Sequence, residues 1–135
     1  MQKKILIVDD DPNMVTAIKA VFKGDTYEVI TASNGEEGLK EIVEQKPDVV
    51  ILDVVMPVKN GFQVCKELKT EPKFKAFSKI PVLMLTVYPD DREKLLLSMQ
   101  DGMMMEAEDY IQKPFDPDEL LERVVKLTKV TSSAR

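Results

Sequence analysis

Short apolar runs rich in β-branched residues alternate along this chain with longer segments of helical period, and this alternation constrains the fold most. It predicts strands over residues 4–8, 27–32, 48–53, 81–86 and 108–112. It predicts helices over residues 12–23, 35–45, 60–70, 90–105 and 117–129. Strands that are separated by crossover helices pair in parallel. We therefore expect an α/β domain, with a doubly wound five-stranded parallel sheet flanked by five helices.

The composition of the strands and of their flanking turns refines this prediction. The first, third and fourth strands are continuous apolar runs, which is typical of strands covered by helices on both faces. The second strand is more polar, and we expect it at an edge. Asp11 is placed to cap the helix that starts at Pro12, and Gly24 is placed to end that helix.

Length and charge limit the classes of protein that fit. A chain of 135 residues with 44% hydrophobic content suits one domain, which we expect over residues 1–129, with residues 130–135 as a polar tail or the start of a truncated linker. A net charge of -5 argues against direct nucleic-acid binding. Cys65 is the only cysteine, and there is no signal peptide or apolar run long enough to span a membrane. We expect a cytoplasmic protein.

Aspartates cluster where two of the predicted strands end. Asp9, Asp10 and Asp11 follow the first strand, and Asp53 ends the third. The carboxyl ends of parallel strands meet at one edge of the sheet, where ligands bind in such folds. Crowded carboxylates repel one another unless a cation lies among them, and oxygen ligands suit Mg²⁺ or Mn²⁺. Because Asp11 is explained as a helix cap, we predict a metal site made by Asp9, Asp10 and Asp53.

Thr86 ends the fourth predicted strand and Lys113 ends the fifth, so four separate segments converge on this edge. The ordered set resembles the receiver domain (CheY-like) of two-component response regulators, over residues 3 to about 128. The motifs that carry the resemblance are Asp9-Asp10, Asp53-Val54-Val55-Met56-Pro57, Leu85-Thr86 and Lys113-Pro114-Phe115. The resemblance implies the flavodoxin-like fold of that family.

The resemblance also implies a role for each matching residue. Asp53 would accept a phosphoryl group, with Mg²⁺ held by Asp10, Asp53 and the backbone carbonyl of Val55, and with Asp9 acting through water. Lys113 and Thr86 would stabilise the phosphoryl oxygens. Tyr110 would act as a switch. Receivers also hold the peptide bond before the proline of Lys113-Pro114 in the cis form.

Partners follow from the same resemblance. The chain has no histidine, so a phosphohistidine donor must come in trans from a sensor histidine kinase or a histidine phosphotransfer protein. The output partner would bind the face made by the fourth helix, fifth strand and fifth helix, and a homodimer through that face is conceivable. The domain would be a phosphoacceptor rather than an enzyme, although it would assist its own phosphoryl transfer and autodephosphorylation.

Two spacings are longer than is usual in receivers. The first surplus falls in the loop over residues 71–79, which we expect to be a neutral surface insertion. The second falls before Tyr110 and predicts a longer fourth helix that ends in Met103-Met104-Met105. Val55 and Tyr88 flank the pocket and would screen it from water. The following lysines are expected to form a solvated face: Lys66, Lys69, Lys73, Lys75 and Lys79.

Other functions stay open from the sequence. A haloacid dehalogenase-like phosphatase also uses a strand-end aspartate with Mg²⁺, but it requires a second aspartate at position 55, where this chain has valine. A nucleotide or flavin binder would need a glycine-rich phosphate loop, and the chain has none. A degenerate receiver that acts as a scaffold, or the receiver of a transcription factor separated from its output domain, also remains possible.

Overall fold

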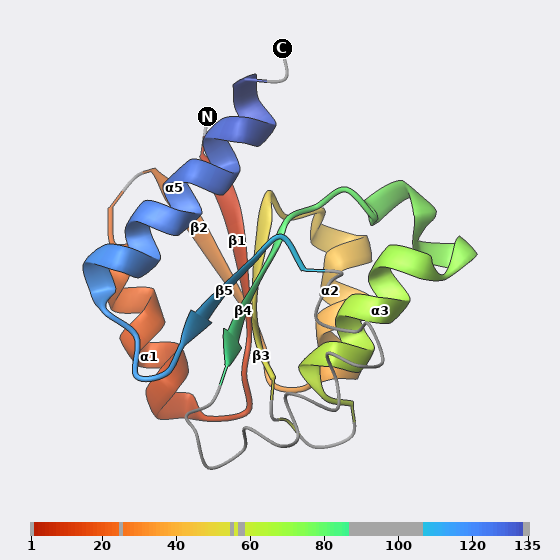
Figure 1. Ribbon diagram of the computed structural model, residues 1–135, viewed down its shortest axis with the longest axis horizontal. Helices are drawn as coiled ribbons and strands as arrows, with labels where there is room; N and C mark the ends of the chain where they lie inside the picture. Colours follow the sequence, from red (N-terminus) through yellow and green to blue (C-terminus); the bar gives the residue numbers. More distant parts are fainter. Residues whose placement is uncertain (1, 25, 55, 57–58, 87–106, 134–135) are drawn as a thin grey trace.

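The computed structural model describes residues 2–24, 26–54, 56, 59–86 and 107–133. Its centre is a five-stranded sheet in the order β2-β1-β3-β4-β5, in which every pair of neighbouring strands is parallel (Figure 1). The strands are β1 (Lys3–Val8), β2 (Tyr27–Ala32), β3 (Val49–Asp53), β4 (Val82–Thr86) and β5 (Asp109–Gln112). The predicted parallel sheet is therefore confirmed, with strand ends that differ by one residue or none.

Helices cover both faces of the sheet (Figure 1). They are α1 (Pro12–Val21), α2 (Gly35–Gln45), α3 (Gly61–Thr70), the short 3₁₀ helix η1 (Pro72–Phe77) and α5 (Pro117–Ser133). Helices α1 and α5 lie on one face, and α2 and α3 lie on the other. The predicted fourth helix, with Tyr88 and Met103-Met104-Met105, lies outside the described residues. No helix in the described part of the chain is long and apolar enough to cross a bilayer.

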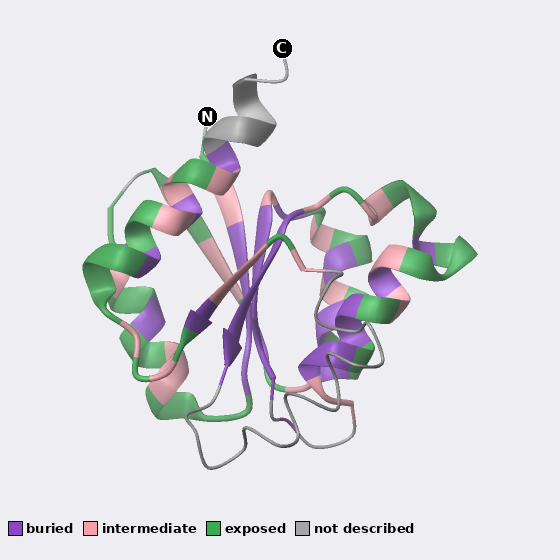
Figure 2. Cartoon of the chain, viewed as in Figure 1, coloured by how far each residue is buried: buried purple, intermediate pink, exposed green. Residues whose placement is uncertain are grey.

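Two apolar cores lie on opposite faces of the sheet because successive side chains of each strand point in opposite directions. In β1, Ile5 and Ile7 pack toward α1 and α5, whereas Leu6 and Val8 pack toward α2 and α3. Strands β1, β3 and β4 are almost wholly buried (Figure 2). As predicted, β2 is an edge strand, and most of its side chains are half-buried or exposed.

The helix ends follow the predicted chemistry with one difference. Asp11 caps α1, because its side chain accepts a hydrogen bond from the backbone N–H of Asn13, and Gly24 adopts a left-handed φ of 118° shortly after α1 ends. Helix α5 continues to Ser133, beyond the predicted end at residue 129. No glycine or proline stands between those two positions to stop it.

The surplus residues after α3 are not a plain surface loop. They form η1, and the side chain of Phe74 is buried against α2 and α3. The expectation of a solvated lysine face is wrong for Lys69, whose side chain is only 8% exposed. Its Nζ donates hydrogen bonds to the carbonyl oxygens of Ser78 and Ile80 at 2.7 and 2.8 Å. Lys69 therefore fixes the connection between η1 and β4.

Lys69 also reaches the start of β5 through Glu108. Its Nζ lies 3.0 Å from Oε2 of Glu108, while Oε1 of the same carboxylate accepts a hydrogen bond from the backbone N–H of Val82 at 2.8 Å. The backbone N–H of Glu108 donates to the carbonyl of Val82 at 3.0 Å. This pairing sets where β5 enters the sheet, and hence where the residues at its far end lie.

Gly61 provides a test of how closely α3 approaches β3. A Cβ at this position would lie 2.4 Å from the backbone oxygen of Asp53, so we expect Gly61→Ala to lower the free energy of unfolding by about 2 to 4 kcal/mol. Urea unfolding would measure the change. Gly38→Ala is the control, because its Cβ would meet only the side chain of Val8 and alanine favours the helix by about 1 kcal/mol. Equal losses in the two variants would contradict this interpretation.

Candidate functional site

Three carboxylates meet at the edge of the sheet where β1 and β3 end. Asp9 and Asp10 directly follow β1, Asp53 ends β3, and the register pairs Val8 with Leu52. One oxygen from each of Asp9, Asp10 and Asp53 lies within 4.8 Å of the others. The structure thus brings together the three carboxylates that the sequence predicted to form a metal site.

Asp9 is the buried member of this cluster, with 2% of its surface exposed. Its Oδ1 accepts a hydrogen bond from the backbone N–H of Asp11 at 3.0 Å, but its Oδ2 has no hydrogen-bond partner among the described residues. Burial raises the pKa of Asp9 from 3.8 to about 6, and the nearby charge of Asp53 adds to the increase. Hydrogen bonding from Asp11 and the charge of Lys113 act in the opposite direction.

Lys113 supplies the positive charge of the site. Its Nζ donates a hydrogen bond to Oδ1 of Asp53 at 2.7 Å, and the Asp53 side chain is only 4% exposed. The backbone N–H of Lys113 donates to the carbonyl of Thr86 at 2.7 Å, which fixes the end of β5 beside the end of β4. The bond between Lys113 and Pro114 is cis, as the resemblance implied.

Thr86 ends β4, the strand next to β3, and Tyr110 lies on β5, where it pairs with Met84 of β4. Thr86 is 7% exposed, and its hydroxyl donates a long hydrogen bond of 3.4 Å to the carbonyl of Ile111. Tyr110 is half-buried and packs against the core on the α2 and α3 side of the sheet. Position 55, whose carbonyl was predicted to bind the metal, lies outside the described residues.

The donor atoms fit a hard divalent cation. All are carboxylate oxygens, and three aspartates with one lysine leave an excess of negative charge in a largely buried place. Oδ2 of Asp9 is a buried acceptor without a described donor, and a bound cation would satisfy it. Mg²⁺ and Mn²⁺ prefer such ligands. Asp9, Asp10 and Asp53 are the described residues that would hold the ion.

One polar network close to this site was not predicted from the sequence. Lys59, in the segment between β3 and α3, pairs with Glu36 of α2 and with Glu67 of α3. These three residues lie on three separate segments of the chain and share no motif. Only the packing of α2 against α3 brings them together.

The raised pKa of Asp9 predicts that this carboxylate destabilises the metal-free fold. Because the pKa in the folded protein, about 6, lies above the ordinary value of 3.8, wild-type stability should fall as pH rises through this range. We expect Asp9→Asn to raise the free energy of unfolding at about pH 7.5, without divalent metal, by about 1 to 3 kcal/mol. Urea unfolding would measure this gain, and adding Mg²⁺ should stabilise the wild type more than the variant.

Asp11→Asn is the matched control for this experiment. It removes one negative charge from the same loop, but Asp11 is an exposed N-cap and asparagine caps helices equally well. Its stability should therefore stay close to that of the wild type. Equal gains in the two variants would mean that general charge repulsion, rather than the burial of Asp9, is responsible.

Comparisons with known proteins agree with this arrangement. The chain is 41% identical, over 124 residues, to the alkaline phosphatase synthesis transcriptional regulatory protein PhoP of Bacillus subtilis, covering 92% of this chain and 48% of that protein. It is 35% identical to the DNA-binding response regulator MtrA of Mycolicibacterium smegmatis, covering 92% of this chain and 50% of that protein. The chain therefore spans about half the length of these curated relatives.

A solved structure and a family model complete the comparison. A putative response regulator from Chloroflexus aurantiacus J-10-fl superposes with a TM-score of 0.78 at 36% identity, covering 96% of this chain and 99% of that one. Neither the phosphatase nor the scaffold alternative finds support in these matches. Residues 5–125 match the family model of the response regulator receiver domain. The chain belongs to this family and is a receiver domain of two-component signalling.

Proposed function

We propose that this receiver domain accepts a phosphoryl group on Asp53 in a reaction that depends on Mg²⁺. The observation that carries the proposal is that Asp53 belongs to the metal-compatible carboxylate cluster and also accepts a hydrogen bond from the ammonium group of Lys113. A carboxylate can attack a phosphoryl group when the charge on that group is neutralised. Both sources of positive charge would be available at this residue.

Each residue then has a defined part in the transfer. An oxygen of Asp53 forms the new bond to phosphorus as the bond from phosphorus to the donor's imidazole nitrogen breaks, and the imidazole keeps the electron pair. Lys113, which now donates to Asp53 at 2.7 Å, is within reach of the oxygens of the group transferred to it. The bound ion would supply further neutralisation of the phosphoryl charge. Asp9 and Asp10, with Asp53, would hold that ion.

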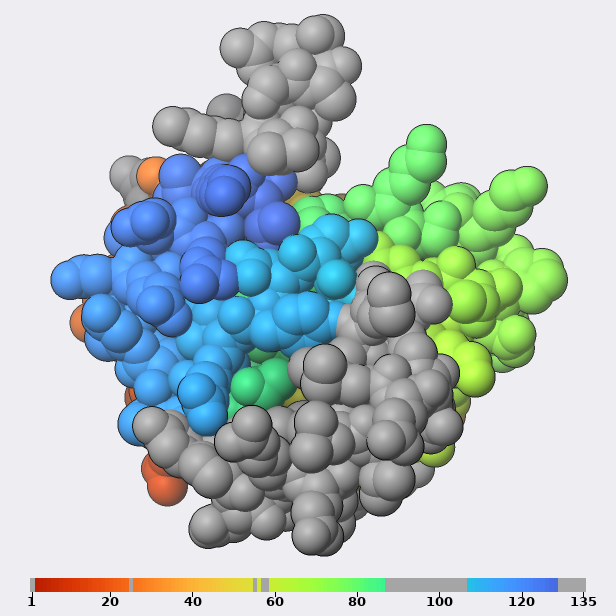
Figure 3. Space-filling model, viewed as in Figure 1, coloured from red at the N-terminus to blue at the C-terminus, as the bar shows by residue number. Residues whose placement is uncertain are grey.

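The change would be transmitted through β4 and β5. Among the described residues, the hydroxyl of Thr86 makes a single long hydrogen bond, to the carbonyl of Ile111, so it can turn toward a phosphoryl oxygen at little cost. We propose that this movement makes room for the side chain of Tyr110 on β5, which then moves into that space. Strand β5 and helix α5 form one continuous surface (Figure 3), and an ion pair at 2.6 Å joins Arg123 to Asp109 across it. That surface is where the output partner would bind.

The partners remain proposals. Because the chain has no histidine, a sensor histidine kinase or a histidine phosphotransfer protein would supply the phosphoryl group in trans. Its relatives are named as transcriptional or DNA-binding regulators, and these names describe proteins about twice as long. We propose that this domain does not itself contact DNA, given its net charge of -5, and that it controls an output partner or a second copy of itself.

The extent of the receiver, the range of its chemistry and its location follow from the same function. The receiver would occupy residues 1–129, and the last turn of α5, which continues to Ser133, would lead into a tail or linker. The domain would have no separate substrate, and its chemistry would be limited to gaining and losing its own phosphoryl group. We place it in the cytoplasm, which is consistent with its single cysteine, Cys65, buried in α3.

Intact-mass measurement with acetyl phosphate would test the proposal. We expect a phosphoryl adduct on the wild type when Mg²⁺ is present, and none when a chelator removes the metal, because the charge on the transferring group would then be unopposed. Asp53→Asn should show no adduct under either condition. Asp48→Asn is a suitable control, since Asp48 lies at the opposite end of β3 and its side chain accepts a hydrogen bond from the backbone of Lys4.

Three results would contradict this function. The absence of an adduct on the metal-loaded wild type would indicate a receiver that has lost its chemistry and acts as a scaffold. Steady release of phosphate without any adduct would instead indicate a phosphatase. An adduct that persisted in Asp53→Asn would move the acceptor to another residue.

A further inference from the structure

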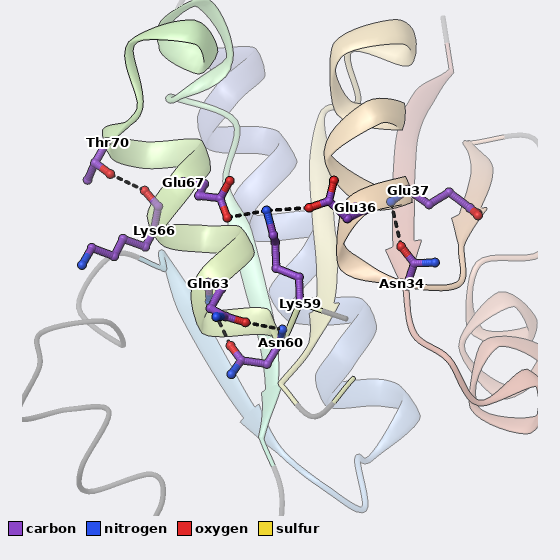
Figure 4. A network of polar contacts seen from close by, with 9 residues as sticks. All are labelled: Asn34, Glu36, Glu37, Lys59, Asn60, Gln63, Lys66, Glu67 and Thr70. Atoms are coloured by element: carbon purple, nitrogen blue, oxygen red, sulfur yellow. Dashed lines mark hydrogen bonds and ion pairs between the residues drawn. The ribbon is translucent and has the colours of Figure 1, made fainter. Parts of the chain in front are cut away.

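Lys59 joins the two helices that cover one face of the sheet. Its Nζ lies 2.7 Å from Oε1 of Glu36 on α2 and 2.6 Å from Oε2 of Glu67 on α3 (Figure 4). The lysine side chain is only 19% exposed, and the hydrogen bonds that it donates to Glu36 and Glu67 raise its pKa above the ordinary value. One cation thus connects α2, α3 and the segment that leaves Asp53.

The backbone at Lys59 is also held against α2. A Cβ added to Gly35, the first residue of α2, would lie 2.5 Å from the backbone oxygen of Lys59 and 2.9 Å from its Cβ. Only glycine permits so close an approach. The beginning of α2 is therefore packed directly against residue 59.

The residues that directly follow Lys59 are held next to Asp53. The backbone N–H of Gly61 donates to the carbonyl of Val54 at 2.8 Å, and Asn60 caps α3 through reciprocal hydrogen bonds with Gln63 (Figure 4). The backbone N–H of Val54 donates in turn to the carbonyl of Leu85 on β4. A displacement of α3 would therefore also displace the backbone at Asp53.

We propose that Lys59 is a positioning residue for phosphoryl acceptance, because it holds α2 and α3 at the spacing that keeps Gly61 of α3 against the backbone of Asp53 and Val54. The inference rests on the proposed function of Asp53. Without the cation, the carboxylates of Glu36 and Glu67 would lose the ion pairs that they make with the same nitrogen, and their mutual repulsion would favour a wider separation of the helices. Partly exposed ion pairs contribute little to global stability. Loss of Lys59 should therefore change Mg²⁺ binding and adduct formation at Asp53 more than the free energy of unfolding.

Lys59→Met tests this role, because it removes the cation and keeps a long, flexible side chain. We expect it to weaken Mg²⁺ binding, measured by calorimetry, and to slow adduct formation with acetyl phosphate, each by about three- to tenfold. Lys59→Arg should restore both values. Lys40→Met is the matched control. Lys40 lines, together with Lys59, a groove between α2 and α3, but it forms no ion pair with a described residue.

Several outcomes would overturn the inference. A Lys59→Met protein with wild-type Mg²⁺ affinity and adduct rate, but a lower urea midpoint, would show that Lys59 only holds α2 to α3. If that variant fails to fold, Glu67→Gln should still give a smaller loss in the same direction, and no loss would reject the role. Failure of the proposed function is distinguishable, because the wild type itself would then form no adduct, and the positioning role would fail with it.

Discussion

The central constraint in this structure is the crowding of negative charge at a buried edge of an apolar sheet. Every residue that is paired between β1 and β3 is apolar and buried, and this pairing places Asp9 and Asp53 close together. Hydrophobic burial therefore holds carboxylates in an arrangement that their own charges oppose. The high pKa of Asp9 and the ion pair from Lys113 to Asp53 are the two visible consequences of that opposition.

The remainder of the structure supports this edge from a distance. At the other end of the sheet, Lys69 and Glu108 fix the start of β5 against β4, and the far end of β5 carries Lys113. Beside the site, the close contact of Gly61 with Asp53 joins α3 to β3, and Lys59 joins α3 to α2. Contacts made by residues outside the site thus help to set the positions of the charged groups within the site.

Much of the fold was readable in the sequence because the relevant signals are local. Continuous apolar runs predicted the buried strands β1, β3 and β4, and Asp11 before Pro12 predicted the start of α1. The end of α5 was misplaced, since the sequence there has no strong stop signal. Lys69 was misassigned because it belongs to a lysine-rich segment, which suggests solvent exposure. Its long side chain instead reaches backbone carbonyls that only the folded chain brings within range.

The sequence by itself determined the parallel sheet and the identity of the residues at its carboxyl edge, because apolar periodicity decides which segments become strands and the chain order decides where each strand ends. The tertiary structure decided how the charges interact. The 2.7 Å contact of Lys113 with Asp53 and the bridge from Lys59 to Glu36 and Glu67 join residues from separate elements. Folding also buries Oδ2 of Asp9 where no described residue donates a hydrogen bond to it. Electrostatic energies depend on distance and burial, and neither exists until the chain has folded.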